Sequence, residues 1–185
     1  MAAARSASEL GEALIIASED NMIVEICRLL TLGADVNYVH RQMHEGTEST
    51  TPLIQAALNG HADTMRVLIS RGAEVNKHEP CDGCTALQRA TERGHVPVIE
   101  LLMSKGARHD VRSKLGRTPL FLAAYKGHKE AAICLLDHGA DVDAKDNEGF
   151  SSLLTAAVYG HLPVVDLFVL RGADLHLANN KDSFL

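Results

Sequence analysis

The side chains that could most readily bind a metal or take part in redox chemistry are Cys81, Cys84 and His78, which lie close together in the sequence. Two cysteines separated by two residues, with a histidine three residues earlier, have the spacing of half a zinc site or of a redox pair. An Asp-Gly pair lies between the cysteines, however, and this pair is typical of a tight turn. No second cysteine pair lies near them in the sequence. The pattern therefore favours a turn without bound metal, and a metal or redox role for Cys81 and Cys84 is the alternative.

Histidine is the commonest side chain in acid-base catalysis, and the chain contains ten of them. Four recur at a regular interval, each directly after a glycine, at His61, His95, His128 and His161. Because they recur once per unit, we predict that these imidazoles bond backbone groups between adjacent units. The sequence contains no nucleophile elbow, phosphate-binding loop or H-E-x-x-H motif. It therefore predicts a protein without catalytic activity and without a cofactor.

Short helices must position these side chains, and the stretch 115–143 shows the helical pattern most clearly. Thr118 is a good helix N-cap, and Pro119 suits the first helical position, where no amide partner is lost. Gly127 can end this first helix in a left-handed conformation. A second helix follows at once and ends at Gly139. Each unit is therefore predicted to be a pair of short helices joined by turns.

The same unit recurs along most of the chain. Its Gly-Ala pairs begin in steps of 34, 33 and 33 residues, at Gly72, Gly106, Gly139 and Gly172. Two short helices with narrow apolar faces cannot bury those faces alone, so the copies must stack. The sequence predicts an all-α repeat solenoid.

The period of 33 residues, with its TPL, A-A, G-H, L-L and G-A-D signatures, resembles the ankyrin repeat. The resemblance covers about five repeats, at 10–40, 50–80, 81–113, 114–146 and 147–180. It implies stacked helix-turn-helix units with projecting hairpin loops. It also implies an adaptor that binds a protein or peptide on the concave surface formed by hairpin tips and first helices. Direct inhibition or regulation of an enzyme such as a kinase is an alternative that the resemblance leaves open.

Some positions depart from the repeat pattern. Residues 1–9 precede it and are predicted to be flexible, and residues 38–49 form a longer connection that predicts an extended loop. Residues 181–185 read as the start of a further repeat. The last second helix is also unusually apolar, so we expect either further repeats or another subunit to cover the C-terminal end. The histidine that follows TPL in the family is replaced in every repeat, which predicts that the Thr-His hydrogen bond of the family is absent.

The positions that bind partners in the family carry a basic and aromatic set of side chains in this sequence. Tyrosine and arginine dominate interface hot spots, so we expect this set to form a binding patch for a partner with carboxylates and an apolar anchor. The predicted patch consists of Arg93, Arg112, Leu115, Arg117, Tyr125, Lys126, Phe150 and Tyr159.

Two asparagines follow the pattern leucine, five residues, acidic, valine, asparagine. They are Asn37 and Asn76. In ankyrin-like proteins such asparagines can be targets of an asparaginyl hydroxylase. Hydrogen bonding within turns is the alternative explanation for both residues.

The bulk composition excludes several classes of function. A net charge of −6 argues against a nucleic acid partner, which needs clustered Lys and Arg. No apolar run is long enough for a membrane span or a secretory signal. Four cysteines without paired framework spacing indicate a reducing compartment, so we expect an intracellular location in the cytoplasm, the nucleus or both.

Overall fold

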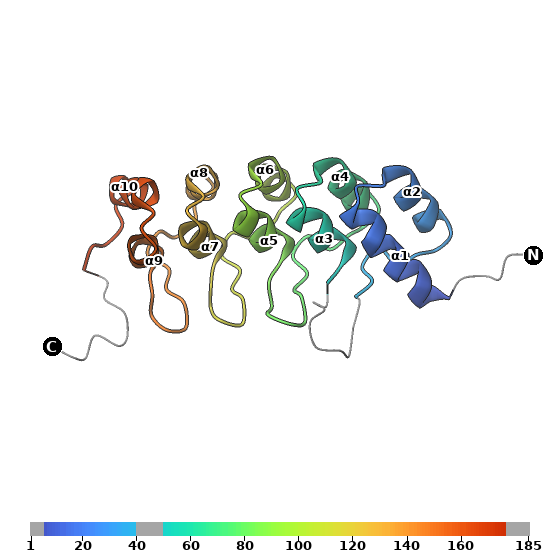
Figure 1. Cartoon of the computed structure of the whole chain (residues 1–185), viewed down its shortest axis with the longest axis horizontal. Helices are drawn as coiled ribbons and strands as arrows, with labels where there is room; N and C mark the ends of the chain where they lie inside the picture. The colour runs from blue at the N-terminus through green and yellow to red at the C-terminus, as the bar shows by residue number, and fades with distance from the viewer. Residues whose placement is uncertain (1–5, 40–49, 177–185) are drawn as a thin grey trace, which may run out of the picture.

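The helices of the protein form an elongated double row, as the computed structural model shows for residues 6–39 and 50–176 (Figure 1). The first helix of each repeat lies in one row, and hairpin loops project beyond it. The first helices are α1 Ala7–Glu19, α3 Pro52–Leu58, α5 Ala86–Arg93, α7 Pro119–Lys126 and α9 Ser152–Val158. The second helices, in the other row, are α2 Ile23–Thr31, α4 Ala62–Ser70, α6 Val96–Ser104, α8 Lys129–Asp137 and α10 Leu162–Leu170. The described residues thus form an all-α repeat solenoid with one isolated bridge, between Lys145 and Ser151.

The helix ends follow the predicted capping chemistry. The Thr118 side chain accepts a hydrogen bond from the Phe121 backbone N–H at 3.2 Å, and Gly127 ends α7 with a φ of 74°. Helix α1 begins at Ala7, within the segment 1–9 that was predicted to be flexible and before the predicted start of the first repeat at residue 10. The reason is a capping box, in which Ser6 and Glu9 each bond the other's backbone N–H.

The core is a ladder of equivalent side chains. One position of each second helix carries an apolar residue without solvent exposure: Leu29, Leu68, Leu102, Leu135 and Phe168. Helices from successive repeats contact one another within each row, so each of these side chains lies between neighbouring helix pairs. Packing within each helix pair and packing between successive repeats therefore both hold the array together.

The recurring Gly-His pairs connect one repeat to the next, as predicted. In each case the imidazole Nε2 donates to a carbonyl of the preceding repeat: His61 to Glu19, His95 to Leu58, His128 to Glu92 and His161 to Tyr125. The glycine makes room for the ring, because a Cβ on Gly94 would lie 2.8 Å from the His128 Nδ1. These histidines are structural.

The third repeat keeps a polar interaction that the sequence did not lead us to expect. Gln88 occupies the position of the missing family histidine, and its Oε1 accepts a hydrogen bond from the Thr85 N–H at 3.0 Å. Its Nε2 donates to the Arg117 carbonyl of the next repeat at 2.8 Å. The glutamine therefore caps its own helix and also ties repeats three and four together.

Several predictions concern residues outside the described ranges. These are the flexible segment up to residue 5, most of the extended loop 38–49, and the possible further repeat at 181–185. Among the described residues, no helix has the length and apolar character that crossing a membrane requires.

Candidate partner-binding surface

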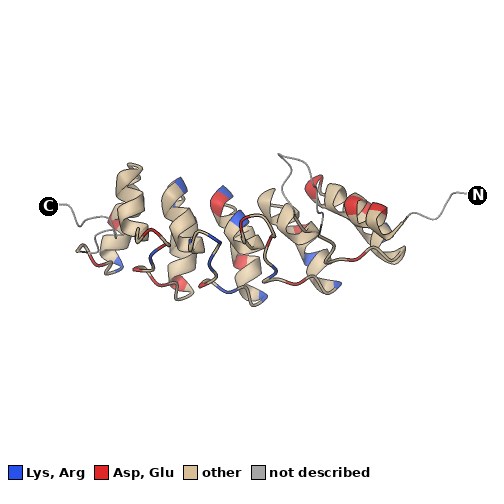
Figure 2. Ribbon diagram, turned by 90° about the horizontal axis from the view of Figure 1, so that it is seen from below, with Lys and Arg blue, Asp and Glu red and all other residues tan. Residues whose placement is uncertain are grey.

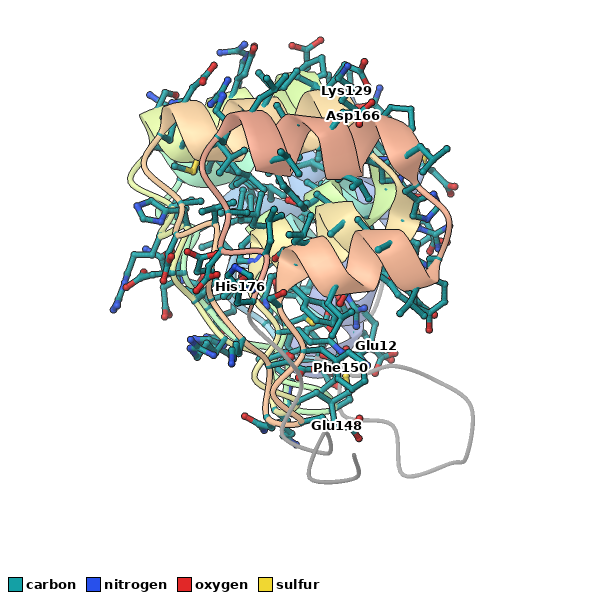
Figure 3. All side chains as sticks on the ribbon, turned by 90° about the vertical axis from the view of Figure 1, so that its left-hand side faces the viewer. Glu12, Lys129, Glu148, Phe150, Asp166 and His176 are labelled. Carbon is teal, nitrogen blue, oxygen red and sulfur yellow. The ribbon has the colours of Figure 1, made fainter. Side chains whose placement is uncertain are left out.

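A groove between repeats four and five gathers four of the chain's seven Phe and Tyr residues. It has a volume of about 180 Å³ and lies where α7 and α9 meet the hairpin loop before α9. We call it the aromatic groove, and its lining is Arg117, Phe121, Tyr125, Asp146, Glu148, Phe150, Thr155, Val158 and Tyr159. Figure 3 shows Phe150 and Glu148 on the hairpin below α9.

Tyr125 lies at the centre of this groove. Its ring meets the Tyr159 ring edge-on, with centroids 4.6 Å apart and planes at 78°. Two cations also lie over its ring, with the Arg117 Cζ at 5.8 Å and the Lys126 Nζ at 5.0 Å from the centroid. The Arg117 Cζ is in addition 5.3 Å from the Phe121 centroid. The protein's own cations therefore already interact with these two rings.

Asp146 shapes the hairpin that carries Phe150. Its side chain is only 4% exposed, and its Oδ1 accepts backbone N–H bonds from Glu148 at 2.9 Å and Phe150 at 3.0 Å. Its Oδ2 lies 3.9 Å from the Arg117 Nε, which is buried and has no hydrogen-bond partner among the described residues. Asp146 thus holds the loop in shape and also faces the cation of the groove.

A second pocket adjoins the first at Lys126. It has a volume of about 370 Å³, and its lining is Glu92, Arg93, Lys126 and His128, from the ends of α5 and α7. We call it the basic pocket. The Glu92 carboxylate lies 3.1 Å from the Arg89 guanidinium and 3.7 Å from the Lys126 Nζ. Its negative charge is therefore shared between two cations of the protein.

Comparison with known proteins agrees with this architecture. The family model described as ankyrin repeats (3 copies) matches residues 14–113 and 103–179, which together span most of the chain. The chain belongs to the ankyrin repeat family. A comparison with curated proteins gave no match. Ankyrin repeats are generally protein interaction modules, so the surface of the array, rather than a buried cavity, is where function is expected.

Six of the eight predicted patch residues of this ankyrin array line the two pockets. Arg117, Tyr125, Phe150 and Tyr159 line the aromatic groove, and Arg93 and Lys126 line the basic pocket. Leu115 lies on a hairpin loop, 55% exposed, and lines neither of them.

Arg112 lies apart from the other residues of the predicted patch. Its Nη1 donates to the Gly116 carbonyl at 3.0 Å and to the Lys145 carbonyl at 2.6 Å. The guanidinium therefore joins two ankyrin hairpins. It lines a different pocket, with His109 and Asp141, instead of the two described above.

Five residues that line the aromatic groove were not part of the predicted patch: Phe121, Asp146, Glu148, Thr155 and Val158. Phe121 stands where the family has its histidine, so that substitution could have indicated it. Asp146 and Val158 carry no comparable signal. Moreover, Asp146 and Glu148 balance Arg117, so the aromatic groove is less basic than the predicted patch. Figure 2 shows the same mixture of signs along the ankyrin hairpin loops.

The C-x-x-C segment forms a turn that is unfavourable for thiolate chemistry. The Asp82 Oδ1 accepts the Cys84 N–H at 2.9 Å, and the His78 Nδ1 bonds the Gly83 carbonyl at 2.7 Å. Burial strongly raises the pKa of the Cys84 thiol, and burial together with Glu79 raises the pKa of Cys81. Ligand atoms of Glu79, Cys81 and Asp82 lie within 4.8 Å of one another, but Arg89 binds both carboxylates. This arrangement favours a structural turn over a metal or redox site.

Asn37 and Asn76 both join adjacent ankyrin repeats. Asn37 donates to the Gly72 carbonyl at 3.1 Å and accepts the Glu74 N–H at 2.8 Å. Asn76 makes the equivalent pair of bonds in the next repeat. These bonds account for both asparagines, and their hydroxylation stays a prediction.

Proposed function

We propose that this ankyrin array is a non-catalytic adaptor that binds a protein or peptide on its concave surface, at the aromatic groove and the basic pocket. The observation that carries the proposal is the aromatic groove itself, because more than half of the Phe and Tyr residues of an aromatic-poor chain line it. Tyrosine and arginine contribute most to interface hot spots. A groove built on packed helices also loses little conformational freedom when a partner binds.

The charges and exposed rings indicate the partner's chemistry. Lys126 and Arg93 offer cations for carboxylates, and Phe150 with the half-exposed Tyr159 offers apolar area for an anchor side chain. A partner with acidic groups beside an apolar residue suits both features. We further propose a cytoplasmic or nuclear location, because the four cysteines are all unpaired.

The double substitution Tyr125→Ala and Arg117→Glu tests the proposal. It removes the central ring and replaces the one arginine of the groove with a carboxylate, so we expect at least about tenfold weaker partner capture, as for the loss of a hot spot. Quantitative affinity capture from a cell lysate, followed by titration of the captured partner, measures this loss.

The matched control is Arg66→Glu on α4, an exposed arginine outside both pockets. Circular dichroism should show the same helix content in all three proteins at the temperature of the capture experiment, whereas the unfolding temperature of the double variant should fall, because the new carboxylate at position 117 would lie beside the buried Asp146. Equal partner capture by the wild type and the double variant would show that the partner binds to another surface.

The C-terminal end presents a second surface that we propose is covered in the cell, either by further repeats or by another subunit. Ala57, Thr91 and Ala124 occupy one position of successive repeats and are buried, whereas their equivalent Ala157 is exposed. Nearby, Leu162 is 69% exposed, whereas the equivalent Val96 and Lys129 are partly buried, and Leu170 is 84% exposed at a position that is exposed in every repeat. This face therefore has the form of a repeat-stacking surface without its neighbour.

Leu162→Lys combined with Leu170→Lys tests this second proposal. The isolated wild-type chain should associate as its concentration rises, because the bare face is apolar, whereas the double lysine variant should stay monomeric. Sedimentation velocity measures the difference, with Val24→Lys at the other end of the array as control. A wild-type chain that remains monomeric at high concentration argues against a covered face.

A further inference from the structure

The basic pocket and the aromatic groove differ in charge, so they suit different side chains of a partner. In the basic pocket, Arg93 and Lys126 face a single carboxylate, that of Glu92. Arg89 already holds this carboxylate from the other side at 3.1 Å. Arg93 has no ion pair or hydrogen-bonded side-chain partner in the described part of the chain. The pocket therefore has a surplus of positive charge and suits an acidic side chain.

The aromatic groove suits an uncharged side chain. A cation entering it would meet Arg117 and Lys126, which already interact with the rings of Phe121 and Tyr125. An anion would meet the carboxylates of Asp146 and Glu148. The exposed apolar area that remains belongs to Val158 and Tyr159, which are 64% and 54% exposed, together with Phe150. An apolar side chain is thus the best match for this groove.

The positions of the pockets set the spacing between these two side chains. The basic pocket lies between α5 and α7 and the aromatic groove between α7 and α9, and these three helices contact one another in succession. Packed helices lie about 8 to 10 Å apart, so the pockets are separated by about that distance. A segment in the extended polyproline II conformation rises about 3.1 Å per residue with three residues per turn, so side chains three positions apart lie on the same face, about 9 Å from each other.

The dimensions of the groove favour an extended partner over a helical one. A volume of about 180 Å³ accommodates a side chain. A helix with its side chains has a diameter of about 10 to 12 Å and would contact only the rim.

We propose that the partner presents an extended segment in which an acidic and an apolar residue are separated by two residues. The acidic side chain enters the basic pocket, and the apolar side chain enters the aromatic groove. This inference rests on the proposed function and adds the order of the two anchors across the array and their spacing. The direction in which the segment runs is read from the experiment.

A random nonapeptide library displayed on phage tests the spacing. The wild-type protein should enrich peptides in which Asp or Glu and a large apolar residue are three positions apart. Synthetic peptides with the enriched motif should bind at least about tenfold more weakly when either anchor is replaced by alanine.

Two protein variants test which pocket binds which anchor side chain. Arg93→Glu should weaken the preference for an acidic residue and leave the apolar preference unchanged, because Arg93 lines only the basic pocket, whereas Tyr159→Ala should relax only the apolar preference. Arg66→Glu is the control for unspecific charge effects, and thermal unfolding checks that each variant is folded.

The possible failures are distinguishable. Enrichment of groove-dependent peptides with another spacing, or exchange of the two preferences between the variants, overturns this inference and leaves the proposed binding surface in place. A selection in which no peptide depends on Arg93 or Tyr159 overturns both the inference and the proposed binding surface.

Discussion

Replacing Arg89 with methionine should lower the free energy of unfolding by about 3 to 5 kcal/mol, the usual cost of leaving a buried charge without its partner. Arg89 is 8% exposed, and its guanidinium lies 2.6 Å from Glu79, 2.8 Å from Asp82 and 3.1 Å from Glu92. Glu79 is itself only 3% exposed. The substitution would leave the Glu79 carboxylate buried and without its cationic partner in the hairpin before α5. Urea unfolding followed by circular dichroism measures the loss of stability.

The loss should depend on pH. Burial raises the pKa of the Glu79 carboxyl, and bonds from Arg89 oppose that rise, so removing Arg89 should raise the pKa further. A carboxyl with a raised folded pKa contributes stability below its unfolded pKa and loses it as the pH rises through the folded value. The deficit of Arg89→Met should therefore be smaller near the unperturbed Glu pKa of about 4.3 than at neutral pH.

Two controls isolate this buried charge. Arg66→Met removes an exposed arginine that is 3.8 Å from Asp63, and it should change stability by no more than about 0.5 kcal/mol. Adding Glu79→Gln to Arg89→Met removes the stranded charge and should recover part of the loss. An Arg89→Met protein as stable as the wild type at neutral pH would show that the cluster does not hold the hairpin.

Leu135→Ala should cost about 2 to 5 kcal/mol, because it leaves a cavity between stacked repeats. The Leu135 side chain lies on α8 without solvent exposure, and α8 contacts both α6 and α10. Since each repeat of an array depends on its neighbours, we expect faster hydrogen exchange in repeats four and five than in repeat two. Urea unfolding and amide exchange measure the two effects.

Leu170→Ala is the matched control for this substitution. Leu170 is 84% exposed on α10, so its truncation should shift stability by no more than about 0.5 kcal/mol. If both leucine variants unfolded at the wild-type urea concentration, the ladder of buried second-helix residues would not be what holds the repeats together.

The fold could be predicted because local chemistry repeats. A threonine before Pro119 and a glycine after the first helix specify a helix pair wherever they recur, and recurrence at 33 residues specifies stacking. Helix α1 begins three residues before the predicted first repeat, because the Ser6-Glu9 capping box that starts it lies outside the repeat pattern. The role of Gln88 could not be predicted either. Its side chain bonds the Thr85 N–H and the Arg117 carbonyl, and the residue type alone does not reveal these two partners.

The candidate surface could be predicted only in part. Repeat positions identify which residues lie on the hairpins and the ends of first helices, and six of eight named residues line the two pockets. The repeat position of a residue does not determine the direction in which its long side chain points. Arg112 bonds two carbonyls of neighbouring hairpins, whereas Arg117 turns toward the rings of α7. Both arginines looked equivalent in the sequence.

By itself, the sequence determined the helix pairs, their stacking order and the family, because each depends on contacts within one repeat or on exact recurrence along the chain. Only the tertiary structure decided which charged side chains form ion pairs inside the protein and which face solvent. Arg89 and Arg93 are four residues apart on one helix, yet the first lies buried among three carboxylates and the second lines an open pocket. That distinction arises from side chains that neighbouring loops bring together in space, and no spacing along the chain records it.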